Sequence, residues 1–412
     1  MKKNTSFQVF SPVLKTGILL ILFVLNIPVL YPAQDNGSTS TPTRRFALVI
    51  GANDGGPGRM KLRYAVSDAK AFAGLLASMG GVSEEDCILL REPDRQAFFS
   101  EMKALQKRIR DGRAESGRVE SIVYYSGHSD EKNLLLGKQK ISYREFRDAV
   151  KEIDAEVHIA ILDSCASGAF TQLKGGKKKT PFLIDNAYNM KGYAFMTSSS
   201  SNETSQESDR LRGSFFTHYL ISGMRGAADM NRDGKVTLSE AYQYAFNETL
   251  AQTEKTMSGP QHPNYNIRMS GTGDVVMTEI RRSSSVLSLS GPLSGRIFIR
   301  TRQDDLIAEL NKSPGPAIEI GLEEGTYRLV NIREDQVYEA KIALHKGGNF
   351  KLAVDKFQKT DRIFTRPRGS MAAPRQDGNA RKRKKRFQVE FYGGFAGMAP
   401  ADLNLIAASD QQ

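Results

Sequence analysis

The fold and chemistry of this chain are constrained most by two apolar segments that end in small-residue turns. One turn holds a cysteine and the other a histidine. The first segment and its turn span residues 160–168 and contain Cys165; the second spans residues 122–128 and ends in Gly127 and His128. If both are strands of a parallel sheet, their ends lie on the same edge, where open α/β proteins bind ligands. A thiol and an imidazole at one edge are the components of a cysteine nucleophile and its base.

The two segments resemble the caspase and metacaspase superfamily of cysteine peptidases. That family has a hydrophobic strand followed by Ser-Gly-His, then a second followed by Asp-x-Cys-x-Ser-Gly, and both patterns occur here in that order, at residues 126–128 and 163–168. The resemblance begins with residues 46–51 and 62–69 and extends over about residues 45–279. It implies a caspase-like α/β fold, with a mostly parallel sheet flanked by helices.

Strand-like and helix-like segments alternate in the expected peptidase domain, residues 45–282, which predicts a parallel sheet independently of the resemblance. The expected strands are residues 45–51, 87–90, 121–126, 157–162, 192–197 and 274–279, and the expected helices are residues 65–79, 96–110, 142–150, 214–227 and 238–253. Beyond residue 285 the segments are short and alternating, which predicts a small all-β, sandwich-like accessory domain over residues 285–356. We expect a spacer or binding module there, because no residue in it suggests chemistry.

Cys165 is the candidate nucleophile and His128 the candidate acid and base. The backbone N–H groups of Gly127 and Cys165 are candidate donors to the oxyanion, and Gly127 has no side chain to block the approach. The alternatives are a buried cysteine beside a strand and a structural loop histidine.

The resemblance also implies a substrate pocket that accepts Arg or Lys. Asp163 occupies the position that is aspartate in metacaspases, where it lines the pocket for the residue before the cut, and a carboxylate there pairs with a basic side chain. Ser126 matches another metacaspase pocket position, and Asp54 is a candidate second carboxylate. A turn or cap role is the alternative for Asp163.

Residues 229–240 match the 12-residue loop of an EF-hand. The candidate ligands are oxygen donors at the required spacing: Asp229, Asn231, Asp233, the backbone carbonyl of Lys235, and Glu240. Gly234 provides the sharp turn, and helices are expected on both sides. We therefore expect a calcium ion, with a helix–turn–helix containing an Asp-Gly turn as the alternative.

The N-terminus is predicted to be an export signal. Basic residues precede an apolar stretch that is short for a membrane span, and Ala33 suits the last position before a cleavage site. We assign residues 1–33 to a signal peptide and residues 34–44 to a linker, with an uncleaved anchor as the alternative. The protein is therefore expected to be exported, to the periplasm, the cell envelope or the extracellular space.

The net charge of +12 is unevenly distributed along the chain. Basic residues concentrate in residues 365–386, which we predict to be a disordered linker, with binding to an anionic surface such as a membrane as the alternative. Because the remaining globular part is close to neutral, no nucleic-acid partner is expected. Residues 387–412 begin like the first strand of an outer-membrane barrel, and they are either the start of a barrel or an isolated tail.

The chain has 2 cysteines, Cys87 and Cys165. A disulfide between them would consume the candidate nucleophile. Cys87 begins an apolar run, so we predict that it is a buried structural thiol.

Together these observations predict an exported caspase-like cysteine endopeptidase that cleaves protein or peptide substrates after Arg or Lys. Two alternatives stay open: a catalytically silent binding or scaffold protein of the cell envelope, and an envelope structural protein with a C-terminal barrel. The lysine- and glycine-rich segment 174–179 follows the cysteine turn, where caspase-type enzymes carry the linker between their large and small parts. We expect self-cleavage after a lysine of this segment.

Overall fold

The computed structural model describes residues 43–165, 191–200, 203–271 and 273–360. All of them belong to one compact unit. The predicted signal peptide, the basic linker, the C-terminal tail and the segment 174–179 lie outside the described residues. No helix in the described part of the chain combines the length and apolar character that a membrane span requires.

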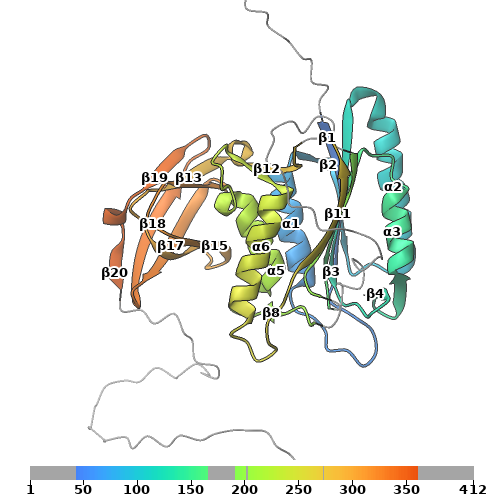
Figure 1. The fold of residues 1–412 in the computed structure, drawn as a ribbon, viewed down its shortest axis with the longest axis horizontal. Helices are drawn as coiled ribbons and strands as arrows, with labels where there is room; N and C mark the ends of the chain where they lie inside the picture. The colour runs from blue at the N-terminus through green and yellow to red at the C-terminus, as the bar shows by residue number, and fades with distance from the viewer. Residues whose placement is uncertain (1–42, 166–190, 201–202, 272, 361–412) are drawn as a thin grey trace, which may run out of the picture. The chain divides into compact units, whose positions relative to one another are not determined.

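A six-stranded sheet forms the centre of the N-terminal part (Figure 1). Its strand order is β11-β7-β6-β3-β1-β2, and β11 alone runs antiparallel to its neighbour. The strands are β1 (Thr43–Ala52), β2 (Val82–Arg91), β3 (Arg118–Gly127), β6 (Val157–Asp163), β7 (Lys191–Thr197) and β11 (Asn264–Ser270). Because both faces of a parallel sheet are covered, β1, β3 and β6 are buried along most of their length.

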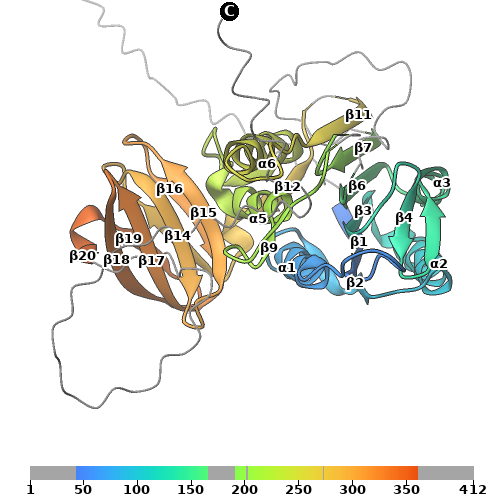
Figure 2. The same ribbon diagram turned by 90° about the horizontal axis from the view of Figure 1, so that it is seen from below.

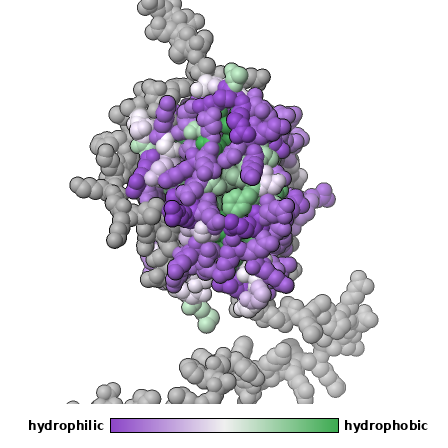
Figure 3. All heavy atoms as spheres, turned by 90° about the vertical axis from the view of Figure 1, so that its right-hand side faces the viewer, coloured by the Kyte–Doolittle hydropathy of each residue, from purple (hydrophilic) through white to green (hydrophobic). Residues whose placement is uncertain are grey.

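Helices pack on both faces of this sheet. One face carries α1 (Ala65–Ser78), α5 (Phe215–Ser222) and α6 (Leu238–Thr253), and the other carries α2 (Arg95–Gly112) and α3 (Tyr143–Lys151) (Figure 2). Phe98, Met102, Leu105 and Ile109 recur at helical spacing and bury one side of α2. The outward surface of the layer formed by α2 and α3 is mostly hydrophilic, as Figure 3 shows.

The α/β fold class predicted from the sequence, a mostly parallel sheet flanked by helices, is confirmed, with differences in detail. The helix expected over residues 214–227 ends at Ser222 and continues as the π-helix η3 (Gly223–Ala227). The expected last strand, β12 (Val276–Glu279), pairs with β10 (Lys235–Thr237) and does not join the central sheet. The edge strand of that sheet is β11, which was not expected.

Residues 285–360, here called the β-region, form two sheets around one apolar core. The first has the order β16-β13-β19 and the second the order β15-β14-β17-β18-β20. The strands are β13 (Ser285–Leu289), β14 (Gly295–Thr301), β15 (Leu306–Lys312), β16 (Ile318–Leu322), β17 (Gly325–Arg333), β18 (Gln336–Leu344), β19 (Asn349–Leu352) and β20 (Gln358–Thr360). Leu287 and Ile320 of the first sheet and Ile297 and Leu329 of the second are fully buried. This two-sheet packing is that of a sandwich.

The helical layer meets the β-region at η3. Gly226 has a φ of +124°, and a Cβ on it would lie 2.1 Å from the carbonyl oxygen of Glu319 on β16. Both the positive φ and the close approach of the two backbones require glycine at this position.

Replacing Gly226 by alanine should therefore destabilise the fold by about 2–3 kcal/mol, because the new methyl group strains the backbone and separates η3 from β16. Thermal unfolding followed by circular dichroism measures this. The matched control is Gly74→Ala in α1, where a Cβ would have no neighbour within 4 Å. That change should stabilise the protein by about 1 kcal/mol through helix propensity. A Gly226→Ala variant as stable as the wild type would contradict the contact.

Candidate active site

Strands β3 and β6 are neighbours and end at the same edge of the sheet. Ser126 is paired with Asp163, and the chain then leaves each strand toward His128 and Cys165. The hydroxyl of Ser129 donates a hydrogen bond to the carbonyl oxygen of Cys165, which joins the two turns directly. The structure therefore brings the candidate imidazole and thiol to one edge, as the paired motifs predict.

The backbone carbonyl of His128 is held by two hydrogen bonds, one from a buried tyrosine and one from a hairpin. The hydroxyl of Tyr125 donates to the carbonyl oxygen of His128 at 2.7 Å, and the N–H of Leu135 donates to the same oxygen at 3.0 Å. Leu135 lies on β4 (Asn133–Leu136), which pairs with β5 (Gln139–Ser142). A Cβ on Gly127 would lie 2.5 Å from the Tyr125 hydroxyl, so this contact requires glycine there.

The ring of His128 is oriented by the loop that follows β1. Its Nε2 lies 2.9 Å from the carbonyl oxygen of Met60. Because a carbonyl oxygen only accepts, the hydrogen is on Nε2, and Nδ1 is left as the basic nitrogen. A Cβ on Gly55 would lie 2.4 Å from the ring, so the glycine makes room for this orientation.

The environment keeps both groups neutral. Burial raises the pKa of the Cys165 thiol. Burial also lowers the pKa of His128, and Arg59 acts in the same direction, against the Met60 carbonyl and Asp54. Burial therefore favours the neutral form of both the thiol and the imidazole.

A serine-rich loop after β7 supports the cysteine turn. The N–H of Ser164 donates to the Ser198 hydroxyl at 3.0 Å, and the Ser199 hydroxyl donates to the carbonyl oxygen of Ser164 at 3.1 Å. The Cys165 thiol lies 3.8 Å from the carbonyl oxygen of Ser205. Sequence reasoning did not assign a role to these serines, although their run directly after an apolar strand is visible in the sequence.

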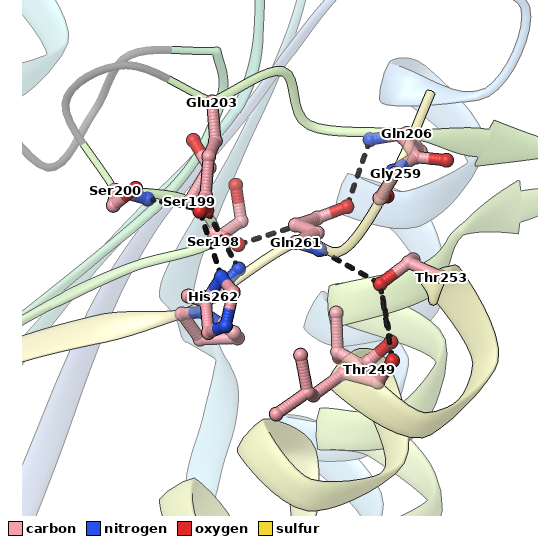
Figure 4. A network of polar contacts seen from close by, with 12 residues as sticks. Ser198, Ser199, Ser200, Glu203, Gln206, Thr249, Thr253, Gly259, Gln261 and His262 are labelled. Atoms are coloured by element: carbon pink, nitrogen blue, oxygen red, sulfur yellow. Dashed lines mark hydrogen bonds and ion pairs between the residues drawn. The ribbon is translucent and has the colours of Figure 1, made fainter. Parts of the chain in front are cut away.

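The same loop is secured to the segment before β11 by polar contacts of Gln261 and His262 (Figure 4). Gln261 is fully buried; its Oε1 accepts from the N–H of Gln206 at 3.0 Å and its amide nitrogen donates to the carbonyl oxygen of Ser198 at 2.7 Å. His262 Nδ1 lies 2.7 Å from the carboxylate of Glu203. The loop that positions Ser205 is thus held at both ends.

Asp163 ends β6, two residues before Cys165, and is a buried carboxylate. Among the described residues its hydrogen-bond donors are hydroxyl groups: Ser205 at 2.8 Å, Thr217 at 2.6 Å, and Ser214. The same Ser214 donates its N–H to Asp68 at 3.0 Å, so the two carboxylates are close. Burial, followed by the charge of Asp163, raises the pKa of Asp68 well above its usual range.

A third carboxylate, Glu207, lies beside this pair. It accepts the N–H groups of Arg63 and Tyr64, both at 3.0 Å, while burial and the charge of Asp163 raise its pKa. In the described part of the chain, Asp68, Asp163 and Glu207 have no basic side chain as an ion-pair partner. These three carboxylates form a cluster, here called the acidic pocket, in which Asp68 lines a cleft.

The carboxylate that accompanies Asp163 is therefore Asp68, whereas sequence reasoning chose Asp54. Asp54 is exposed; its carboxylate accepts the N–H of Gly56 at 2.8 Å, and its charge opposes the lowering of the pKa of His128. Asp68 sits on the inner face of α1 beside the core residue Ala69. The sequence signal for Asp68 is a charged residue on the otherwise apolar, buried face of a helix. Ser126 is buried and neighbours Asp163 across the sheet, and its pocket role stays a prediction.

The loop 229–240 has oxygen donors that currently accept hydrogen bonds from its own backbone. Asp229 accepts the N–H groups of Arg232 and Gly234, at 2.7 and 3.1 Å. Glu240 accepts the N–H of Thr237 at 2.9 Å in the capping box of α6. Similar bonds join Asn231 to Asp233 and Asp233 to Lys235. Among the described residues, no group of three or more His, Cys, Asp or Glu side chains converges to hold a metal ion.

Cys87 and Cys165 are both free thiols. Cys87 lies on the edge strand β2, paired with Ala47 on β1, and the two strands β1 and β3 separate β2 from β6. It is partly buried against the core, in line with the structural thiol predicted from the sequence.

Comparison with known proteins gives one family match. The model of the caspase domain, Peptidase C14, matches residues 44–271. Among solved structures, the chain is similar to the crystal structure of caspase-1 from Spodoptera frugiperda, with 12% sequence identity and a TM-score of 0.41, covering 58% of this chain and 91% of that chain. No curated protein matches the chain.

The raised pKa of Cys165 predicts how fast the thiol reacts with iodoacetamide. In a Cys87→Ser background, alkylation of Cys165 should be slow at neutral pH and should still increase above pH 9, because the reactive thiolate forms only above the raised pKa. The rate is measured by mass spectrometry as a function of pH. A rate that already reaches its plateau in the acidic range would show a thiolate–imidazolium pair and contradict the neutral one.

Proposed function

Because the chain belongs to the caspase-domain family of peptidases, we propose that it is a cysteine endopeptidase in which Cys165 is the nucleophile and His128 transfers the proton. The observation that carries this proposal is the arrangement of two adjacent strand ends. There, His128 and Cys165 follow neighbouring strands, and the Met60 carbonyl holds the hydrogen on Nε2 of His128, which leaves Nδ1 as the basic nitrogen.

In the first step the Cys165 sulfur attacks the carbonyl carbon of the substrate amide, and the thiol proton passes to Nδ1 of His128. The electron pair of the carbonyl moves to its oxygen, toward the N–H groups of Gly127 and Cys165. Collapse of this intermediate breaks the C–N bond, and His128 returns the proton to the leaving amine. Water, deprotonated by the same nitrogen, then cleaves the thioester and restores the thiol.

The acidic pocket supports cleavage after Arg or Lys. Asp68, Asp163 and Glu207 are buried or half-buried carboxylates, and a basic side chain entering between them would neutralise charges that now repel each other. An acidic side chain would add a further negative charge to the same space. Charge complementarity therefore favours the basic residues and excludes Asp and Glu.

Hydrolysis of short Arg, Lys and Asp amides tests both the chemistry and the pocket. The wild type should cleave the Arg and Lys amides, the Asp amide should be the poorest, and Cys165→Ala and His128→Ala should be inactive but folded. Asp163→Asn and Asp68→Asn should each lower kcat/KM for the Arg amide by at least about 30-fold, because losing one partner of a buried charge pair costs about 2–5 kcal/mol.

Asp274→Asn is the matched control, because Asp274 accepts backbone N–H groups at the start of α6 and not in the pocket. It should retain the wild-type preference. A preference for the Asp amide would refute the basic pocket, and full activity in folded Cys165→Ala would refute the dyad. A catalytically silent scaffold would hydrolyse none of the three amides.

Two further parts of the proposal rest on the sequence alone. We propose self-cleavage after a lysine of segment 174–179, whose basic residues suit the acidic pocket; the Cys165→Ala chain should then stay intact while the wild type is cut. We also propose export through residues 1–33, which places the peptidase in the periplasm, the cell envelope or the extracellular space. Association of the basic linker 365–386 with an anionic envelope surface belongs to the same proposal.

We propose in addition that the loop 229–240 binds calcium. Its donors are the carboxylate, amide and carbonyl oxygens that calcium prefers. Burial, together with the nearby charges of Asp233 and Glu240, raises the pKa of Asp229, which means that these carboxylates repel one another without a cation. To act as a ligand, Glu240 would have to release the N–H of Thr237.

Calcium should therefore raise the unfolding temperature of the wild type and give a heat of binding by calorimetry, while magnesium at the same concentration should do less. At a calcium concentration of 100 times Kd, binding should raise the free energy of unfolding by about 2.7 kcal/mol. Glu240→Gln is the sharp variant, because glutamine keeps the capping box of α6 but removes the charged bidentate ligand. No heat of binding in the wild type would leave the loop as a structural turn.

A further inference from the structure

The pocket carboxylates are connected to the β-region through a hairpin. Residues 207–214, here called the pocket hairpin, consist of β8 (Glu207–Ser208), a turn and β9 (Gly213–Ser214). Glu207 and Ser214 contribute to the acidic pocket, whereas the turn between them reaches β15.

Two arginines of this turn form ion pairs with the β-region. Nη1 of Arg210 lies 3.5 and 3.4 Å from the two carboxylate oxygens of Glu309 on β15. Nη1 of Arg212 lies 2.7 Å from Asp305, directly before β15. The pair formed by Arg212 is exposed on both sides and contributes little, so Glu309 is the more important anchor.

Glu309 is a buried anion whose charge depends on its neighbours. Its side chain is fully buried. Burial opposes ionisation, but His218, Arg210 and Arg296 together lower the pKa of Glu309 to about 2. Since a buried charge is costly unless it is paired, removing these contacts forces this part of the interface to rearrange.

Helix α5 provides a second connection from Glu309 to the pocket. In its first turn, the Thr217 hydroxyl donates to Asp163. One residue later, Nε2 of His218 lies 3.6 Å from the Glu309 carboxylate. At the end of the helix, the Ser222 hydroxyl accepts the N–H of Glu309 at 3.1 Å. Figure 1 shows α5 between the central sheet and the β-region.

The pocket and β15 also border one cleft. This cleft has a volume of about 660 Å³, and its walls include Asp68 on α1, Thr217 on α5, and Leu306 and Ile307 on β15. A displacement of β15 would therefore change the shape of a cleft that Asp68 also lines.

We propose that the β-region is a functional part of the substrate pocket, in which Glu309 is a positioning residue that fixes the pocket hairpin and α5, and through them Asp163 and Glu207. This inference rests on the proposed cleavage after Arg or Lys. It assigns to the β-region a role in selecting substrates in addition to any role as a spacer.

The decisive variant is Arg210→Gln, because it frees the pocket hairpin while Glu309 keeps Arg296. In the full chain, KM for a short Arg amide should rise about fivefold, with kcat changed by less than about twofold, as expected for loss of a partly exposed ion pair that positions but does not react. Alkylation of Cys165 by iodoacetamide, which does not use the pocket, should keep its wild-type rate. Glu309→Gln, if folded, should raise KM by about tenfold or more.

Arg210→Lys should restore the wild-type KM, because a single nitrogen of Arg210 contacts both oxygens of Glu309 and a point charge can replace it. Glu339→Gln is the matched control: Glu339 is a half-buried carboxylate of β18 that is paired with Arg328 inside the β-region. Its KM should equal that of the wild type. An unchanged KM in Arg210→Gln, or an equal rise in Glu339→Gln, would overturn the inference.

Amide hydrogen exchange separates this inference from the proposed function. Arg210→Gln should increase exchange in the pocket hairpin and in the first turn of α5, and Glu339→Gln should not. If the wild type cleaves neither Arg nor Lys amides, the proposed specificity fails, and the exchange measurement still decides whether Glu309 positions the hairpin. Unchanged exchange in Arg210→Gln would show that it does not.

Discussion

The buried carboxylate of Asp163 is the interaction on which the rest of the site depends. It lies at the end of β6, two residues before Cys165, and its donors come from three separate places: the loop after β7, the start of α5 and the pocket hairpin. Hydroxyl groups solvate the charge without neutralising it. Because Asp68 approaches the same point, burial and the charge of Asp163 raise the pKa of Asp68 well above its usual range.

The reacting groups are arranged by backbone atoms more than by charges. A carbonyl orients the ring of His128, a hairpin N–H and a tyrosine hydroxyl hold its main chain, and Gly55 and Gly127 allow these contacts at distances that a side chain would prevent. Burial keeps the thiol and the imidazole neutral.

The β-region packs with the α/β part in one compact unit. Its composition suggested a spacer or binding module, yet it shares one compact unit with the α/β part and contributes a fully buried carboxylate to the contact with α5. Backbone packing of Gly226 against β16 and the ion pairs of Glu309 make this contact specific. An interface that contains buried charges orients its partners more narrowly than an apolar one, because each charge must meet its counterpart.

The sequence by itself determined the order of strands and helices, the two strand-end motifs, and the pocket residue Asp163 that accompanies them, since these are local patterns of apolar spacing and turn residues. The edge strand β11 was missed, although Tyr265, Ile267 and Met269 alternate in it. Only the tertiary structure placed Asp68 beside Asp163, identified the serines that hold the cysteine turn, and brought Glu309 to α5. Those contacts connect residues far apart in the chain, and a local sequence pattern does not predict which acidic residues come into contact in the folded protein.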